Sequence, residues 1–167
     1  MTENEYTALI YDIAEQLVDM LKIKKYTIST AESCTGGMIS TAIVDIPGAS
    51  WVLNEAHVTY SNDSKMRILG VREKTLDEFG AVSGETAREM VRGAAKIACA
   101  DCAIAVTGTA GPDGGTKEKP VGTVYAGFFL KGEIQVVRYN FTGNRQEVRR
   151  ATTCNTLRHM LEWLEKQ

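Results

Sequence analysis

The stretch Thr30-Ala-Glu-Ser-Cys-Thr-Gly-Gly37 decides the fold of this chain. It follows a β-favouring run, Tyr26 to Thr30, and is itself followed by a helix-favouring run. This order predicts a strand, a tight turn and a helix, with unpaired backbone N–H groups where the helix begins. Two nucleophiles, Ser33 and Cys34, lie in the turn. A plainer interpretation stays open at this point, because Ser33 or Thr35 could simply cap the helix.

The composition is that of an ordinary globular protein. The chain has 167 residues, of which 44% are hydrophobic and 24% charged, enough for one domain with a sizeable core. The formal charge of −2 gives no basic field for nucleic acid. No apolar run approaches the roughly 18 to 20 residues of a membrane span. The acidic start, Met1-Thr-Glu-Asn-Glu5, is unlike a signal peptide. We therefore expect a cytoplasmic protein without nucleic-acid or membrane partners.

The four cysteines do not indicate a metal or redox centre. They are Cys34, Cys99, Cys102 and Cys154. The pair Cys99 and Cys102 has CxxC spacing, but it follows a predicted helix, whereas a redox CxxC begins one. No second CxxC or histidine pair completes a zinc site. We predict that Cys99 and Cys102 are small buried hydrophobic residues.

Helices and strands are expected to alternate along the chain. The predicted helices are 2–24, 38–44, 61–70, 73–79, 83–99 and 144–165, and the predicted strands are 26–30, 51–60, 102–106, 121–130 and 133–141. Thr2 with Glu5, and Asn144 with Glu147, have the spacing of capping boxes. The order predicts a three-layer α/β/α sandwich with a mixed, mostly parallel sheet.

Ligands of open α/β sheets bind at the carboxyl ends of the parallel strands. Segments 32–37, 60–65, 107–115 and 143–145 follow predicted strands and are expected to meet there. The glycine-rich loop after residue 107 lacks the GK[ST] ending of an ATP-binding loop. If the segments converge, the site has a nucleophile, backbone donors, a lysine and an arginine.

A serine nucleophile needs a base, and the residues leave two candidates. Lys65 falls in the first turn of its helix, where the helix dipole lowers the pKa of a cation, and Tyr60 could share a proton with it. His57 is a conceivable base in the preceding strand. The plainer alternative for Lys65 is a solvated surface lysine.

Arginines open the last helix. Arg145 in its first turn could hold a phosphate or carboxylate, or could be a surface arginine. Arg149 and Arg150 are expected to face solvent or a partner chain.

The same segments carry a resemblance to a known family. The matching blocks are Thr30 to Gly37, Val58-Thr-Tyr-Ser-Asn62 with Lys65, Leu69-Gly-Val71, Gly80-Ala-Val-Ser83, Thr107 to Gly115 with Lys119 to Val124, and Gly143-Asn-Arg-Gln-Glu-Val-Arg149. They cover almost the whole chain in order and resemble the CinA C-terminal domain family, which includes the bacterial nicotinamide-nucleotide amidases. The chain resembles a stand-alone version, because no extra N-terminal domain precedes these blocks.

The resemblance implies hydrolysis of the carboxamide of nicotinamide mononucleotide to nicotinate mononucleotide and ammonia. It implies no metal or organic cofactor, a three-layer α/β/α fold and a homo-oligomer, with a dimer favoured. By matched position, Ser33 would be the nucleophile and Lys65 its activator, with Tyr60 nearby. The substrate-binding residues would be Glu32, Cys34, Thr35, Gly36, Gly37, Thr107, Gly108, Gly111, Gly114, Gly115 and Arg145.

Acyl transfer is the mechanism these roles suggest. Ser33 would attack the amide carbonyl, and N–H groups around 34–37 would stabilise the oxyanion. Cys34 is the rival nucleophile. A different class of function is a weak or inactive domain that binds a nucleotide or drives oligomerisation. Two departures from the family pattern are relevant to this alternative. Ala56 stands where the family usually has glycine, and its methyl group could crowd the backbone. Asn144 stands where an acidic residue is usual.

Overall fold

A five-stranded sheet in the order β2-β1-β3-β4-β5 forms the middle layer of the computed structural model, which describes residues 3–167. The strands are β1 (Ile28–Glu32), β2 (Leu53–Val58), β3 (Cys102–Gly108), β4 (Thr123–Leu130) and β5 (Glu133–Asn140). β1 pairs in parallel with β2 and β3, whereas β4 pairs antiparallel with β3 and with β5. Only β4 therefore runs against the other strands, and the predicted mixed, mostly parallel sheet is confirmed.

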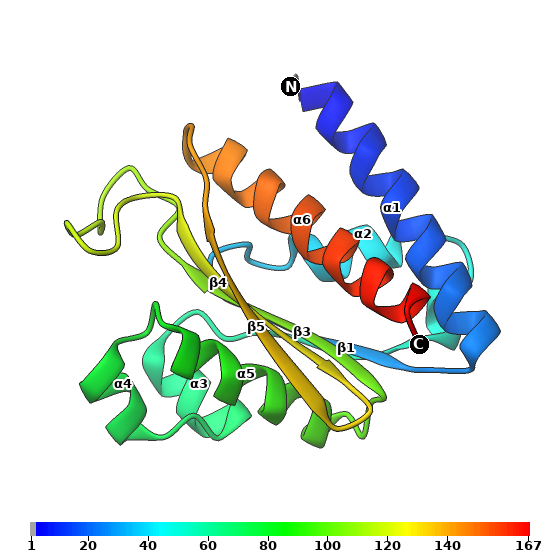
Figure 1. Cartoon of the computed structure of the whole chain (residues 1–167), viewed down its shortest axis with the longest axis horizontal. Helices are drawn as coiled ribbons and strands as arrows, with labels where there is room; N and C mark the ends of the chain where they lie inside the picture. The colour runs from blue at the N-terminus through cyan, green and yellow to red at the C-terminus, as the bar shows by residue number, and fades with distance from the viewer. Residues whose placement is uncertain (1–2) are drawn as a thin grey trace.

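Helices cover both faces of the sheet (Figure 1). On one face lie α1 (Glu3–Lys24), α2 (Met38–Val44) and α6 (Arg145–Glu165); on the other lie α3 (Asn62–Leu69), α4 (Glu73–Phe79) and α5 (Gly84–Ile97). A short 3-10 turn, Ala49–Trp51, precedes β2. The three-layer α/β/α sandwich predicted from the order of elements is confirmed. None of the helices among residues 3–167 is long and apolar enough to span a membrane.

Burial on both faces of β3 explains its continuous apolar sequence. Ile104 packs into the cluster under α1 and α6, and Ala105 packs into the cluster under α5. Both side chains are fully buried. Burying a side chain the size of Ile104 contributes about 1.5–3 kcal/mol of stability. Because both faces of β3 are buried, helices of both outer layers pack against this central strand.

Strand boundaries differ from the predicted ones. β1 begins two residues later than expected and runs to Glu32, because residues 28–32 pair with β3 up to Val106 while the Tyr26 N–H closes the end of α1 on Leu21. The ends of β1 are therefore set by its pairing partners, and local sequence propensity carries no information about those partners. Predicted strand 51–60 likewise shortens to β2, after the 3-10 turn.

The prediction for the CxxC pair is correct for Cys102 and wrong for Cys99. Cys34, Cys102 and Cys154 are buried, and all four thiols are free. Cys99 is exposed, because it lies in the turn after α5 with φ +48°.

The predicted capping box of α6 is confirmed. The Asn144 side chain accepts from the Glu147 N–H, and the Glu147 carboxylate accepts from the Asn144 N–H. The asparagine side chain thus caps α6. The other predicted cap, Thr2, lies outside the described residues.

Candidate active site

The four predicted segments meet at one edge of the sheet. β1, β2 and β3 are parallel, so their carboxyl ends lie together, and Ser33, Thr59 and the loop after Gly108 follow them directly. α6 begins at the same edge with Arg145, whose guanidinium reaches both Gly111 and Tyr60. Residues far apart in sequence thereby form one cluster of polar groups.

Lys65 lies buried at the centre of this cluster. Its Nζ is 3.1 Å from Ser33 Oγ, 2.9 Å from the Thr59 carbonyl oxygen and 3.0 Å from the Tyr60 carbonyl oxygen. The residue is 1% exposed, so the interpretation of a solvated surface lysine is wrong. Burial in a site with no carboxylate among these three partners lowers the pKa of Lys65.

The three contacts of Lys65 fit both protonation states of its amine. A protonated lysine has three N–H donors, one for each oxygen. After losing one proton, Lys65 keeps two N–H groups for the Thr59 and Tyr60 carbonyls and turns a lone pair toward Ser33. The amine is then placed to accept the hydroxyl proton of Ser33.

Cys34, beside Ser33, has a thiol that stays protonated at neutral pH. Burial raises the pKa of its thiol to about 12. At neutral pH the side chain is therefore a neutral thiol rather than the thiolate that a cysteine nucleophile requires. Of the two nucleophiles in the turn, the structure favours Ser33.

Glu32 holds the turn in shape, a role the sequence did not reveal. Its fully buried carboxylate accepts from the Gly37, Ile39 and Ser40 N–H groups at 2.8–3.0 Å and from the Thr35 hydroxyl at 2.6 Å. The prediction that Ser33 or Thr35 caps α2 is therefore wrong, because this carboxylate satisfies the first N–H groups of the helix. These contacts keep the Glu32 side chain engaged inside the protein, and its predicted role in substrate binding stays a prediction.

Two of the predicted oxyanion donors are already engaged. The Gly36 N–H donates to the Ser33 carbonyl at 3.1 Å, and the Gly37 N–H donates to Glu32. Within residues 3–167, the N–H groups of Cys34 and Thr35 donate to no oxygen, and both are directed toward the Cys34 sulfur. These two remain as candidate donors for a developing oxyanion next to Ser33.

Arg145 bridges the glycine-rich loop and Tyr60. It donates to the Gly111 carbonyl and to the Tyr60 hydroxyl, each at 2.9 Å. The Tyr60 hydroxyl thus meets Arg145, while its carbonyl meets Lys65, so the expected proton relay through the phenol is not formed in this structure. Both partners of Arg145 are uncharged oxygens, which leaves its positive charge available to an anion.

Two further arginines of α6, Arg149 and Arg150, do not simply face solvent as predicted. Arg149 donates to the Thr35 carbonyl at 2.8 Å and so fastens α6 to the turn that carries Ser33. Arg150 pairs with Glu3 at the start of α1. The spacing of Arg149, four residues after Arg145, places it on the same helix face, but its acceptor on the turn depends on how α6 docks.

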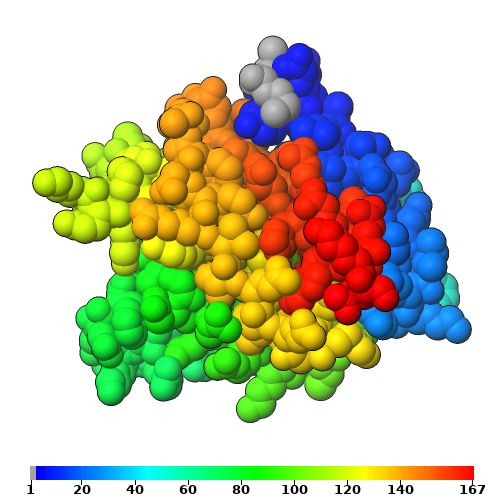
Figure 2. All heavy atoms as spheres, viewed as in Figure 1, coloured from blue at the N-terminus to red at the C-terminus, as the bar shows by residue number. Residues whose placement is uncertain are grey.

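The predicted substrate-binding residues from Thr107 to Gly115 lie at the end of β3 and in the loop that follows it. This loop protrudes from the molecule (Figure 2), and backbone shape explains most of these residues. The Thr107 hydroxyl donates to the Ala81 carbonyl at 2.7 Å. A Cβ at Gly108 would lie 2.8 Å from the Thr123 carbonyl oxygen. Gly111 and Gly114 have φ of +83° and +88°, and a Cβ at Gly115 would meet backbone at 2.7 Å. Their predicted contact with substrate stays a prediction.

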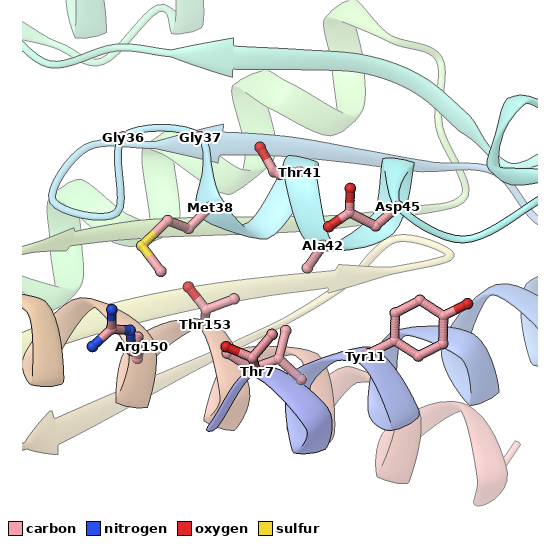
Figure 3. A pocket seen from close by; sticks show the side chains of 11 residues that line it. Thr7, Tyr11, Gly36, Gly37, Met38, Thr41, Ala42, Asp45, Arg150 and Thr153 are labelled. Carbon is pink, nitrogen blue, oxygen red and sulfur yellow. The ribbon is translucent and has the colours of Figure 1, made fainter. Parts of the chain in front are cut away.

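A cavity of about 260 Å³ lies behind the turn, between α1, α2 and α6 (Figure 3). It is lined by Thr7, Ile10, Tyr11, Gly36, Gly37, Met38, Thr41, Ala42, Asp45, Arg150 and Thr153. Gly36 and Gly37 face this cavity, whereas its lining includes none of Ser33, Lys65 and Arg145. It is therefore separate from the place where Ser33 could react.

The remaining candidates lie to the side. His57 Nε2 is 3.0 Å from the Glu55 carboxylate, and Lys65 rather than His57 contacts Ser33. The Ala56 side chain is exposed, so the expected crowding of the backbone by its methyl group does not arise within this chain. Among residues 3–167, no three His, Cys, Asp or Glu side chains cluster closely enough to hold a metal ion.

Comparisons with known proteins agree with this architecture. The model of a family described as the CinA C-terminal domain matches residues 10–164. A Clostridium perfringens protein named as a competence-damage inducible protein is 51% identical over 154 residues, which are 92% of this chain and 36% of that protein. A Clostridium acetobutylicum protein of the same name is 44% identical over the whole chain and 40% of its own length. The chain thus spans about two fifths of the length of these relatives.

Solved structures match over nearly their whole length. A competence/damage inducible protein from Agrobacterium tumefaciens is 41% identical, with a TM-score of 0.91, over 94% of this chain and 96% of that one. A CinA superfamily protein from Klebsiella pneumoniae is 32% identical, with the same TM-score, over 95% of this chain and 99% of that one. The fold and the sequence point to the same group of proteins.

Proposed function

The chain belongs to the CinA C-terminal domain family, and from this premise we propose that it is an amidohydrolase that converts nicotinamide mononucleotide to nicotinate mononucleotide and ammonia. The observation that carries the proposal is the contact of 3.1 Å between buried Lys65 and Ser33. A lysine whose pKa is lowered by burial, directed at a serine hydroxyl, is the arrangement that activates a serine for acyl transfer. A cytoplasmic location is part of this proposal.

The reaction follows from the positions of these groups. Ser33 Oγ attacks the amide carbonyl carbon while its proton passes to Lys65 Nζ, and the N–H groups of Cys34 and Thr35 stabilise the oxyanion. Lys65 then gives the proton to the leaving nitrogen, the C–N bond breaks and ammonia departs. Water attacks the acyl ester, its proton passes through Lys65, and the carboxylate leaves as Ser33 regains its hydroxyl hydrogen.

Arg145 supports the choice of a nucleotide as substrate. Its guanidinium lies at the rim of the site and is held by two uncharged oxygens, Gly111 O and Tyr60 Oη. A phosphate can replace these weaker acceptors with a bidentate, charge-assisted contact. Arg145→Lys should therefore raise KM for the mononucleotide while changing kcat little, and should not affect a substrate without the phosphate.

One experiment tests the proposal. Purified protein is incubated with nicotinamide mononucleotide, and ammonia release and the melting temperature are both measured. We expect catalytic ammonia release by the native protein and its loss in Ser33→Ala, with the melting temperature of the variant close to that of the native protein. Undiminished ammonia release by Ser33→Ala would refute the assignment of the nucleophile.

The same experiment separates the alternative functions. A domain that only binds the nucleotide would show a raised melting temperature without ammonia. A domain that serves only in oligomerisation would show neither change. Either result would overturn the amidohydrolase proposal.

A further inference from the structure

The peptide unit between Thr35 and Gly36 connects the last helix to the candidate nucleophile. Its carbonyl accepts a hydrogen bond of 2.8 Å from the Arg149 guanidinium on α6. Its N–H, which belongs to Gly36, donates to the Ser33 carbonyl at 3.1 Å. The Ser33 N–H in turn donates to the Val106 carbonyl of β3. The backbone of Ser33 is therefore tied to β3 on one side and, through this peptide unit, to Arg149 on the other.

Glycine makes this peptide unit easy to rotate. Rotation changes ψ of Thr35 and φ of Gly36, and Gly36, at φ +61°, has no side chain that would resist the change. The Thr35 hydroxyl donates to Glu32 at 2.6 Å, which fixes the side chain but leaves the carbonyl free to turn. Within residues 3–167, Arg149 alone donates to that carbonyl. With both its hydroxyl and its carbonyl held, Thr35 also keeps its N–H, a candidate oxyanion donor, in one direction.

The charge of the guanidinium strengthens this link at both ends. A hydrogen bond with an ionised donor is roughly twice as strong as one between neutral groups. A cation at the carbonyl also polarises the peptide unit, so its N–H donates more strongly to Ser33. A neutral side chain in place of Arg149 would therefore weaken the bond to the Thr35 carbonyl and the bond to the Ser33 carbonyl together.

Arg145 and Arg149 lie one turn apart on α6 but have different surroundings. Arg145 is exposed at the rim of the site, where it contacts the Gly111 carbonyl and the Tyr60 hydroxyl. Arg149 is partly buried against the turn, and its second terminal nitrogen donates to the Gln146 side chain at 3.1 Å. Arg149 is thus placed to support the turn, whereas Arg145 is placed to meet a substrate.

We infer that Arg149 is a positioning residue for the reaction: it holds the Thr35–Gly36 peptide unit in the orientation that fixes Ser33 and the Thr35 N–H donor. The inference rests on the proposed amidohydrolase function. Small displacements of a nucleophile or of an oxyanion donor slow the chemical step without weakening substrate binding. Loss of Arg149 should therefore lower kcat, whereas the change predicted for Arg145 is a rise in KM.

Kinetics with two substrates test this role. Arg149→Met, which keeps an apolar stem but has no donor, should lower kcat for nicotinamide mononucleotide about 10- to 100-fold and leave KM within about twofold. The nucleoside that lacks the phosphate should show the same fall in kcat/KM. Arg149→Lys keeps a charged donor for the single carbonyl and should recover most of the lost rate. An unchanged kcat in Arg149→Met, or a rise in KM for the mononucleotide alone, would overturn the inference.

Arg150→Met is the matched control. Arg150 is the next residue of α6, but it pairs with Glu3 at the start of α1 and does not contact the turn. Its loss should leave kcat within about twofold of the native value, even if the melting temperature falls. An equal fall in kcat for Arg150→Met and Arg149→Met would mean that any loosening of α6 slows the reaction, and it would contradict a specific role for Arg149.

Acylation by an activated ester separates this inference from the proposed function. Ser33 Oγ attacks the carbonyl carbon of p-nitrophenyl acetate, its proton passes to Lys65, and p-nitrophenolate leaves as the measured product. If the native protein is acylated at Ser33 but releases no ammonia from the mononucleotide, the proposed substrate is wrong and the inference is still tested. Acylation should be about tenfold slower in Arg149→Met than in Arg150→Met. Equal rates would overturn the inference alone, and a native protein that is not acylated at Ser33 would overturn both proposals.

Discussion

The protonation state of a single side chain, Lys65, links stability to activity. Burial lowers the pKa of Lys65 in the folded state, whereas a lysine in an unfolded chain has a pKa of about 10.4. Between these two values the unfolded chain binds more protons than the folded one, so stability rises as pH rises through this window. The neutral amine is also the form that accepts the Ser33 proton, so kcat/KM should rise with pH through the folded-state pKa.

Lys65→Met tests both consequences with one variant. Methionine keeps the length of the buried chain but cannot accept a proton, so we expect kcat to fall about 10²- to 10⁴-fold. The gain in melting temperature between neutral pH and about pH 10 should shrink relative to the native protein. Ammonia release and thermal unfolding across pH measure the two effects. An unchanged acid limb of the pH–rate profile in an active variant would contradict the role of Lys65.

Cys34 should be dispensable for the chemistry. Its thiol pKa of about 12 leaves almost no thiolate at neutral pH. We expect Cys34→Ala to keep kcat within about tenfold of the native value, a change of less than 1.4 kcal/mol in the barrier. Iodoacetamide should label the exposed Cys99 without loss of activity. Loss of ammonia release in Cys34→Ala that retains its melting temperature would instead make Cys34 the nucleophile.

At the scale of elements, the join between β1 and α2 depends on the Glu32 carboxylate. Both of its oxygens accept hydrogen bonds from the start of α2 and from Thr35. Glu32→Gln replaces one acceptor oxygen with an NH₂ group that faces N–H donors, which should cost about 2–3 kcal/mol of stability. Because the same bonds shape the turn that bears Ser33, kcat should also fall.

The matched control for Glu32→Gln is Glu85→Gln. Glu85 is an acidic residue in the first turn of α5 and, unlike the buried Glu32 at the end of β1, it is exposed. Its substitution should change stability by less than about 0.5 kcal/mol and leave ammonia release intact. Equal melting temperatures for the two variants would show that Glu32 is not holding the turn.

Local sequence predicted the helices well where capping serines, glycines or prolines mark their ends. α2 and α4 have the predicted bounds, and Ser61 and Ser83 cap their helices. The order of the elements also predicted that Ser33, Lys65 and the start of α6 lie at the same edge of the sheet. The burial of Glu32 and the clamp from Arg149 could not be predicted, because both depend on how α2 and α6 dock over the end of β1. The spacing of residues in the sequence does not determine how these helices dock.

At the scale of the molecule, the position of Lys65 depends on how closely two helices pack on the far face of the sheet. α5 lies against both the sheet and α3, the helix that carries Lys65. They approach closely at Gly93, where a Cβ would lie 2.0 Å from the Leu69 carbonyl oxygen. Backbone cannot yield as a flexible side chain does, so a methyl group at this point must push α3 away from α5.

Gly93→Ala should therefore damage stability and activity together. We expect a loss of about 3 kcal/mol, at the upper end for overpacking, and a fall in kcat because displacement of α3 carries Lys65 Nζ away from Ser33. Gly84→Ala, on the same helix, is the control: its Cβ would meet only side chains at 3.5 Å or more, and it should raise stability by about 0.5 kcal/mol. Thermal unfolding and ammonia release distinguish the two. Since propensity alone favours alanine at both positions, a Gly93→Ala protein as stable and active as Gly84→Ala would mean that the α3–α5 contact does not set the position of Lys65.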